Sequence, residues 1–283
     1  MKDSTIEWTD HTFSPWHGCV KVSPGCQNCY ALALDRRFGR AVWGPAKTTP
    51  RMEMSAAYWK QPIRWNDAAR KAGKRARVFC ASMADVFEDH PQLPPIRARL
   101  WDLIRATPML DWLLLTKRPE NMYEMLPSEW RQAPRSNVWL GTSCEDQRRF
   151  DERIAPLLST PAAVHFLSCE PLLGPINIGR CRPSWIIAGG ESGPGARPAD
   201  PNWFRSLRDQ ASAAGIAFHF KQHGAWGPWP AGVPFNERAE AFQWIRNVPS
   251  GNHFAVRYEP VYRVGKHAAG RLLDGVEHSE FPR

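Results

Sequence analysis

Short apolar runs alternate with amphipathic stretches through most of the chain. The apolar runs lie at 78–83, 111–116, 137–143, 164–169, 185–189 and 217–221, with a further strand expected near 6–13. Helical spacing between them predicts helices over 93–106, 119–126, 146–158 and 202–214. Continuous apolar runs separated by helices are typical of a parallel sheet with both faces covered. We therefore expect an α/β fold, a full or partial (β/α) barrel of about six to seven parallel strands.

The pattern changes after residue 222. Residues 224–234 are rich in Gly, Pro and Trp and have no clear period, and two short strands are expected near 242–246 and 253–262. We find no internal repeat. We expect a barrel with an N-terminal cysteine loop over residues 1–222 and a small C-terminal cap packed on it over residues 223–283.

Length and composition fit a globular protein. The 283 residues can bury a large core, hydrophobic residues make up 43% of them, and no apolar run approaches the ~20 residues of a membrane span. The first seven residues are polar and lack the apolar core of a secretion signal. Four of the seven cysteines are scattered without a pairing pattern, which suits a reducing compartment. We expect a soluble, cytoplasmic protein without a membrane partner.

The charge balance suggests an anionic partner. Lys and Arg number 37 against 28 Asp and Glu, which gives a net charge of +9, and the chain holds 14 Trp. Such a protein can contact phosphates and stack on bases, so DNA or RNA is a candidate partner through a basic surface. Many basic proteins bind no nucleic acid, so charge alone leaves this partner open.

Three cysteines within eleven residues give the sharpest chemical signal. Cys19, Cys26 and Cys29 have the spacing C-x6-C-x2-C. Three thiolates suit a soft metal centre, and an iron–sulfur cube with three cysteine ligands leaves one iron open for a cofactor or substrate. Zinc is the alternative, because His17 could complete a four-ligand Cys3His site.

Polar residues follow nearly every predicted strand. Functional groups of parallel α/β folds collect at the carboxyl ends of the strands, so these residues are expected to share one rim. Around Gly189 and Gly190 the backbone could approach a ligand closely, although a simple tight turn explains the glycines equally well. The catalytic residue is not identified. The predicted cofactor-binding residues are Asp85, Lys117, Ser143, Glu145, Glu170, Gly189, Gly190 and Glu191.

Several motifs together resemble a known family. They are Trp16-His17-Gly18-Cys19 through Cys29-Tyr30-Ala31, Thr116-Lys117-Arg118-Pro119, Ser168-Cys169-Glu170-Pro171-Leu172, Gly189-Gly190-Glu191-Ser192-Gly193, Phe220-Lys221-Gln222 and Gly265 to Arg271. Nearly end to end, the chain resembles a phage- and bacteria-associated family that carries a three-cysteine motif and has no settled function. That family is in turn similar to radical S-adenosylmethionine (SAM) enzymes.

The resemblance implies a cofactor and a chemistry. Cys19, Cys26 and Cys29 would hold a [4Fe–4S] cluster on a loop after the first strand, and SAM would bind the open iron. An electron donor protein would reduce the cluster, and a 5′-deoxyadenosyl radical would act on substrate, expected to be nucleic acid undergoing repair or base modification. The spacing differs from the usual C-x3-C-x2-C, and the Gly-Gly-Glu element follows the sixth predicted strand rather than the second. The rival interpretation is a nucleic-acid-binding module in which His17 and the three cysteines hold zinc.

Overall fold

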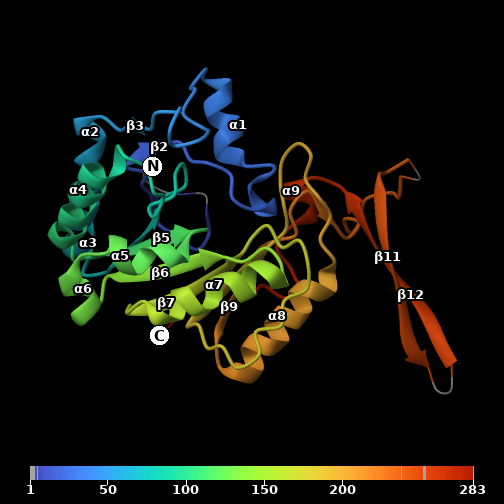
Figure 1. Cartoon of the computed structure of the whole chain (residues 1–283). Coiled ribbons are helices and arrows are strands. Elements are labelled where there is room, and N and C mark those ends of the chain that lie inside the picture. The colour runs from blue at the N-terminus through green and yellow to red at the C-terminus, as the bar shows by residue number, and fades with distance from the viewer. Residues whose placement is uncertain (1–3, 5, 237, 251–252, 283) are drawn as a thin grey trace.

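The chain folds around an open, seven-stranded parallel sheet (Figure 1). The computed structural model describes residues 4, 6–236, 238–250 and 253–282, and it describes 243–250 and 253–258 by their backbone alone. The strands follow one another in space as in sequence, and each pairs in parallel with the next. They are β1 (His11–Thr12), β4 (Ala76–Cys80), β5 (Leu110–Thr116), β6 (Val138–Ser143), β7 (Val164–Cys169), β8 (Trp185–Gly189) and β9 (Ala217–Gln222). Because β1 and β9 both lie at edges, the fold is a partial (β/α) barrel, as predicted.

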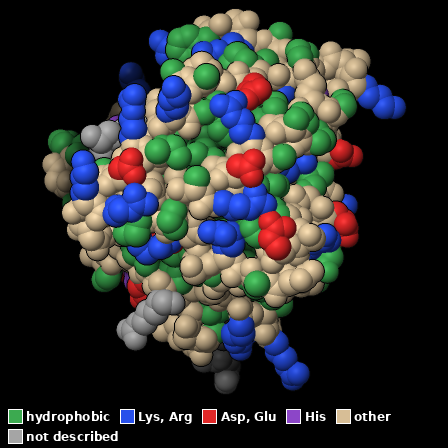
Figure 2. Space-filling view, turned by 90° about the vertical axis from the view of Figure 1, so that its left-hand side faces the viewer, with side chains coloured by type: hydrophobic (Ala, Val, Ile, Leu, Met, Phe, Trp, Pro, Cys, Tyr) green, Lys and Arg blue, Asp and Glu red, His purple; other side chains and the backbone are tan. Residues whose placement is uncertain are grey.

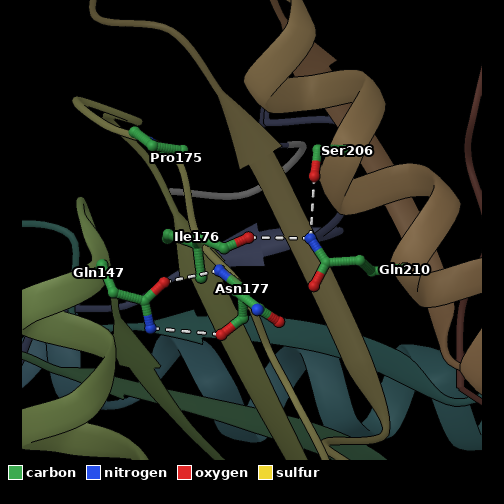
Figure 3. A pocket seen from close by; sticks show the side chains of 6 residues that line it. All are labelled: Gln147, Pro175, Ile176, Asn177, Ser206 and Gln210. Atoms are coloured by element: carbon green, nitrogen blue, oxygen red, sulfur yellow. Dashed lines mark hydrogen bonds between the residues drawn. The ribbon is translucent and has the colours of Figure 1, made fainter.

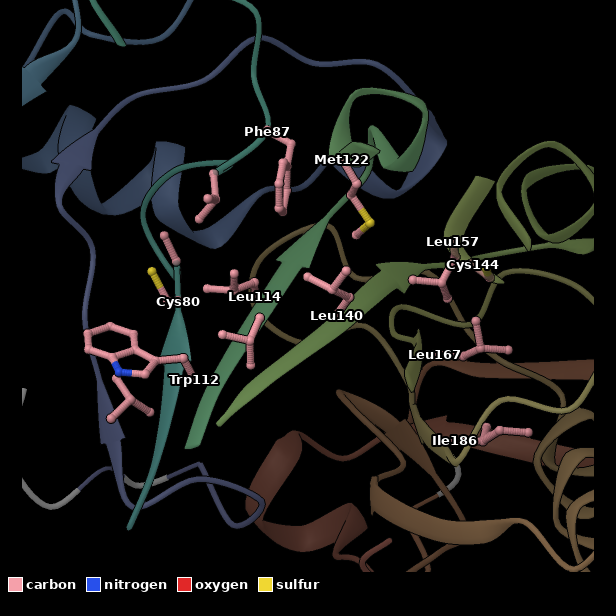
Figure 4. Packing of buried hydrophobic residues seen from close by; sticks show 14 of the residues in the cluster. Cys80, Phe87, Trp112, Leu114, Met122, Leu140, Cys144, Leu157, Leu167 and Ile186 are labelled. Carbon is pink, nitrogen blue, oxygen red and sulfur yellow. The ribbon is translucent and has the colours of Figure 1, made fainter. Parts of the chain in front are cut away.

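Helices cover the outer face of this sheet. They include α3 (Gln61–Ala72), α4 (Leu93–Ala106), α5 (Met122–Met125), α6 (Ser128–Gln132), α7 (Gln147–Ser159) and α8 (Pro201–Ala214). Trp112, Leu114, Leu140, Leu167 and Ile186 point from successive strands into the layer below the helices (Figure 4). Helix starts follow local rules, since Asp146 caps α7 by accepting from the Arg149 backbone N–H. The longer predicted helices agree with α4, α7 and α8 to within one residue.

Among the described residues, the cluster on the inner face of the sheet takes no member from a helix. It consists of strand residues and the aromatic Trp8, with Phe281 packed against it from the C-terminus. A curved sheet buries its concave side against itself, so its strands look equally apolar in sequence whether a helix or the sheet covers them. Members of this cluster are Trp8, Phe79, Leu113, Phe166, Trp185 and Ile187.

Two connections depart from the regular strand–helix alternation. The segment between β1 and β4 carries a two-stranded ladder of β2 (Trp16–His17) and β3 (Met52–Glu53), a 3-10 turn η1 (Pro24–Cys26), and helices α1 (Tyr30–Arg37), α2 (Ala56–Trp59) and α3. A further 3-10 turn, η2 (Pro119–Asn121), precedes α5. Residues 170–184, between β7 and β8, contain no described helix.

The C-terminal residues form a small second sheet and then return to the first. Strands β10 (Trp226–Gly227), β11 (Ala241–Ser250) and β12 (His253–Arg263) pair antiparallel, and the β11–β12 hairpin projects from the body (Figure 1). Helix α9 (Lys266–Ala269) follows. Backbone bonds from Phe220 to His278 and from Glu280 to Phe218 then cover the free edge of β9. Of the helices described, none has the length and apolar character needed to cross a membrane.

Candidate functional site at the cysteine loop and the strand rim

The three cysteines lie on one loop that leaves the first strand and crosses the carboxyl end of β4. Gly18 opens this loop with a backbone bond to Met83 O at 3.1 Å and a parallel bridge to Ala84. Its φ is +107°, and a Cβ there would lie 2.1 Å from Val42 O, so only glycine fits. Cys26 ends η1 and Cys29 immediately precedes α1. The loop therefore sits where functional groups of a parallel barrel collect.

The loop thiols are more exposed than three of the other four cysteines, and Cys181 is half-buried as they are. Cys19, Cys26 and Cys29 are half-buried and free of disulfides, whereas Cys80, Cys144 and Cys169 are fully buried in the core. Cys19 Sγ donates to Val20 O at 3.4 Å and lies 3.5 Å from Arg118 Nη1. Burial, reinforced by the Asp85 charge, raises the pKa of the Cys19 thiol to about 12.

In the part of the chain that the structure describes, no three His, Cys, Asp or Glu side chains are gathered closely enough to hold a metal ion. Convergence of the three thiols on one centre therefore stays a prediction. What can be compared with an iron–sulfur cluster is the donor set, which is three reduced thiols on one short loop, and this set suits the cluster chemically.

Arg118 joins the loop to the end of β4. Its Nη1 donates to Asp85 Oδ2 at 2.7 Å, and its Nη2 donates to Val20 O at 2.8 Å. Burial opposes the charge on Arg118, but the Asp85 carboxylate outweighs it and raises the pKa of the guanidinium. Asp85 also accepts from the Thr116 hydroxyl and from the Lys117 backbone N–H. The carboxylate of Asp85 is thus fully engaged within the protein.

Glu88 supports the same stretch of loop from the segment after β4. Its Oε1 accepts from the Val20 N–H at 3.1 Å, and both its oxygens pair with Arg51 at 2.8 and 2.9 Å. Arg51 is completely buried and also donates to Val42 O and Gly44 O. This pair ties the start of the loop to the segment that returns toward β3.

Glu145 holds the middle of the loop from the end of β6. Its Oε1 accepts from the Gly25 N–H at 3.0 Å, and its Oε2 pairs with Arg153 of α7 at 2.8 Å. Burial alone would raise the pKa of Glu145, but Arg153 and the Gly25 N–H hold it below its ordinary value. A Cβ on Gly25 would lie 3.1 Å from this carboxylate, so the glycine lets the loop approach it.

Glu191 holds the far end of the loop from the turn after β8. It pairs with Arg197 at 2.6 Å and accepts from Asn28 Nδ2 at 3.0 Å. Arg197 also reaches Pro24 O and Gln27 Oε1. Burial opposes ionisation, but Arg197 and Asn28 lower the pKa of Glu191. Glu191 and Arg197 together therefore contact the loop on both sides of Cys26.

Two further pairs lie at the rim and make their hydrogen bonds with each other. Lys221 Nζ lies 2.7 and 2.9 Å from the two Glu170 oxygens, and Lys117 Nζ donates to Ser143 Oγ at 3.0 Å. Side chains alternate between the two faces along a strand, and Ser143 and Lys221 fall on the inner face by this alternation. These two pairs therefore lie on the same side of the sheet as the aromatic cluster of the concave face. The Tyr30 hydroxyl, beside Cys29, donates to Ser82 O.

The two glycines after β8 have different surroundings. A Cβ on Gly190 would lie 1.9 Å from His223 O, so the neighbouring end of β9 requires glycine there. A Cβ on Gly189 would make only ordinary contacts of 3.5 Å with Gln222 O and with Glu170. Packing in the described structure therefore explains why residue 190 is glycine, but it does not explain why residue 189 is.

His17, the fourth ligand of the zinc alternative, is held by α1. Its Nδ1 lies 3.0 Å from Asp35 Oδ1, and Asp35 also accepts from Arg40 and from the Trp43 indole N–H. A carboxylate on one ring nitrogen is the usual support for a metal-ligating histidine, but it also explains a buried histidine that anchors a helix.

The structure brings all eight predicted rim residues to one end of the sheet, and it adds five that sequence reasoning did not select. These five are Glu88, Arg118, Arg153, Arg197 and Lys221, each paired with a carboxylate or an arginine of the rim network. Arg118 and Lys221 lie within strand-end motifs, where they could have been found. Arg153 lies inside a helix and Arg197 in an irregular loop, and neither position carries a sequence signal.

A cavity away from the rim lies on the outer side between α7 and α8 (Figure 3). It measures about 570 Å³, and no charged residue lines it. Gln147 is hydrogen-bonded to the backbone of Asn177, and Gln210 donates to Ile176 O. These amides hold the helix-free connection between β7 and β8, so the cavity occupies the place of a missing helix.

Comparison with known proteins identifies a family and a similar solved structure. A family model described as a protein of unknown function (DUF5131) matches residues 3–282. No curated protein matches the chain. The solved structure is a mutant spore photoproduct lyase with bound AdoMet and dinucleoside spore photoproduct. It is 12% identical, with a TM-score of 0.44 over 90% of this chain and 68% of that chain.

Proposed function

The chain belongs to the DUF5131 family of proteins of unknown function, and we propose that it is a radical SAM-type iron–sulfur enzyme. One observation carries the proposal. The three-cysteine loop lies across the carboxyl end of a parallel half-barrel, and charged side chains from after β4, β5, β6 and β8 all hold its backbone or side chains. A loop that only capped the barrel would not need three free thiols at this position.

The donor set fits a cluster with one open iron. Cys19, Cys26 and Cys29 would be the ligands, and the fourth iron would be left for SAM. The cluster, reduced by an electron donor protein, would supply the one-electron chemistry that cleaves SAM to methionine and a 5′-deoxyadenosyl group able to take hydrogen from substrate. The protein's own part is to position the loop and to keep water from the concave interior.

We assign the rim residues two kinds of role. Asp85, Glu145 and Glu191 position the loop, since each carboxylate is engaged by an arginine. The remaining predicted residues are left to contact SAM, whose amino, carboxylate and ribose groups suit paired charges and the more open backbone at Gly189. These residues are Lys117, Ser143, Glu170, Gly189 and Gly190, with Lys221 added through its pair with Glu170.

An anaerobic turnover assay tests this function. The reconstituted protein, supplied with SAM and a chemical reductant, is expected to form 5′-deoxyadenosine even without substrate. Cys26→Ser should remove this product, while Cys181→Ser, at a half-buried cysteine away from the loop, should keep it. Absence of 5′-deoxyadenosine from a protein with an intact cluster would refute SAM cleavage.

A structural zinc site is the second candidate, favoured by the Asp35–His17 contact. In that case His17 and the three cysteines bind zinc, and the protein binds nucleic acid without catalysis. His17→Ala separates the two functions, because it should release zinc from the second kind of site and leave iron in the first.

A further inference from the structure

Helix α1 carries an exposed apolar stripe directly after the cysteine loop. Tyr30, Leu34 and Phe38 stand four residues apart, on one side of the helix and its end, and are 59%, 41% and 63% exposed. Leu32 and Asp35 bury the opposite side. Two aromatic rings so exposed on one short helix call for a partner surface.

A cavity of about 300 Å³ lies against the same helix and the residues that follow it, and none of the three stripe residues lines it. It is lined by Leu32, Arg36, Gly39, Arg40, Ala41 and Trp43. Arg40 and Trp43 donate to the buried Asp35, while Arg36 forms no ion pair among the described side chains. The cavity thus offers a guanidinium without a counterion beside an indole ring.

The segment around the cysteines carries a net positive charge. Residues 18–51 contain six Lys and Arg side chains and a single acid, the buried Asp35. On the face shown in Figure 2, by contrast, blue side chains are scattered among red and green ones. Residues 60–77 are more basic still, with seven Lys and Arg side chains and one acid, but the large hydrophobic side chain they expose is Ile63. The segment that carries the cysteines combines positive charge with exposed aromatic rings, which suits an anionic partner with stacking bases.

We infer that a single-stranded nucleic acid docks along α1, with phosphates on Arg36 and Arg37 and bases on the exposed rings of Tyr30 and Phe38. The chemistry is that of sequence-tolerant strand binding, which joins a basic groove to stacking side chains. An acidic protein would use the arginines but would have no particular need for Phe38. The inference deepens the proposed function and rests on it, because α1 begins one residue after Cys29 and so leads a bound strand to the rim.

Fluorescence anisotropy of the full chain with a labelled oligothymidylate of about 15 nucleotides tests the inference. Phe38→Ala and Arg36→Gln should each weaken binding about five-fold or more. Arg36→Gln should also flatten the plot of log affinity against log salt by about 0.7. The matched controls are Ile63→Ala and Arg64→Gln on α3, both exposed, and they should change affinity less than about two-fold.

The outcomes separate this inference from the function it rests on. Binding needs no cluster, so metal-free protein should bind the oligonucleotide as well. If the protein does not cleave SAM but the α1 variants bind the oligonucleotide more weakly, the docking surface is supported and the enzyme hypothesis is refuted. The proposed docking surface would be refuted if all variants bound the oligonucleotide equally. It would also be refuted if polyglutamate competed as well as the oligonucleotide and Phe38→Ala had no effect.

Discussion

Two regions on the concave side of one sheet are built from opposite chemistry. Below the rim, between the strands, lies the floor, the aromatic and aliphatic cluster of Trp8, Phe79, Leu113, Phe166, Trp185 and Ile187. At the carboxyl end lies the rim, where carboxylates and arginines pair and contact the cysteine loop. The floor fills the concave interior, and the larger core under the outer helices packs the convex face. Several of the rim's charges position a loop, so charge at this end is in part a structural requirement of the site.

The contacts in the two regions differ in kind. On the floor, Trp8 and Phe79 lie 4.8 Å apart between ring centres, and Trp8 and Trp185 stack edge to face at 6.3 Å. Such contacts are favourable without any partner outside the cluster. Removing one partner of a buried ion pair at the rim, by contrast, leaves the other charge buried without a partner.

Truncation of the floor should have the largest effect on stability. Phe166 is completely buried, so Phe166→Ala should lower the free energy of unfolding by about 3–5 kcal/mol. Phe38→Ala, at a ring that is 63% exposed, is the control and should cost about 0.5 kcal/mol or less. Urea unfolding of the metal-free chain measures both, and equal effects would contradict a distinct floor.

Breaking the buried pair beneath the loop should come next. Arg153→Met leaves Glu145 buried without its partner and should cost about 3 kcal/mol. It should also speed alkylation of Cys26, because Glu145 no longer holds Gly25 in place. Arg148→Met, on the exposed side of the same helix, should change neither quantity. An unchanged alkylation rate in Arg153→Met would show that the pair does not position the loop.

The glycines after β8 give a smaller, sharper contrast. Gly190→Ala forces a Cβ against His223 O and should cost about 1–3 kcal/mol. Gly189→Ala meets only ordinary contacts and should leave stability nearly unchanged. If SAM approaches the backbone here, Gly189→Ala should instead lower SAM affinity in isothermal titration. A Gly189 variant that binds SAM normally would remove Gly189 from the cofactor site.

The floor and the rim should lose stability over different pH ranges. This is the smallest of the expected effects, and neither range reaches neutral pH. Burial lowers the pKa of His219, beside the floor, to about 4 from 6.5. The folded state therefore binds fewer protons than the unfolded one, and stability falls as pH drops from about 6.5 toward 4. Glu145 and Glu191, whose pKa values are lowered, contribute stability at a more acidic pH than this range. Their contribution is lost only as pH falls below about 4.5.

His219→Phe tests this division, because it removes a titrating ring whose two nitrogens have no hydrogen-bond partner in the described structure. The loss of stability between about pH 6.5 and 4.5 should be smaller in the variant than in the parent chain. The remaining slope belongs to His165 and His223, whose pKa values burial also lowers. A slope unchanged in the variant would place the acid sensitivity elsewhere.

The sequence predicts the sheet and the outer helices well, because buried strands and amphipathic helices carry strong periods. It misses α1, whose exposed Leu34 and Phe38 break the usual apolar stripe, and it gives no warning that residues 170–184 lack a helix. Strand-end reasoning places Glu145 and Glu191 at the rim correctly. It cannot show that Arg153 and Arg197 engage them, since such pairs depend on packing between distant segments.

The central claim is that Cys19, Cys26 and Cys29 hold one iron–sulfur centre above the rim. The most direct test is to measure iron, zinc and sulfide, together with the absorbance at about 400 nm, after anaerobic reconstitution. About four irons and four sulfides per chain are expected. They should be lost in Cys29→Ser and retained in His17→Ala and Cys181→Ser. One zinc per chain, released by His17→Ala, would contradict the claim.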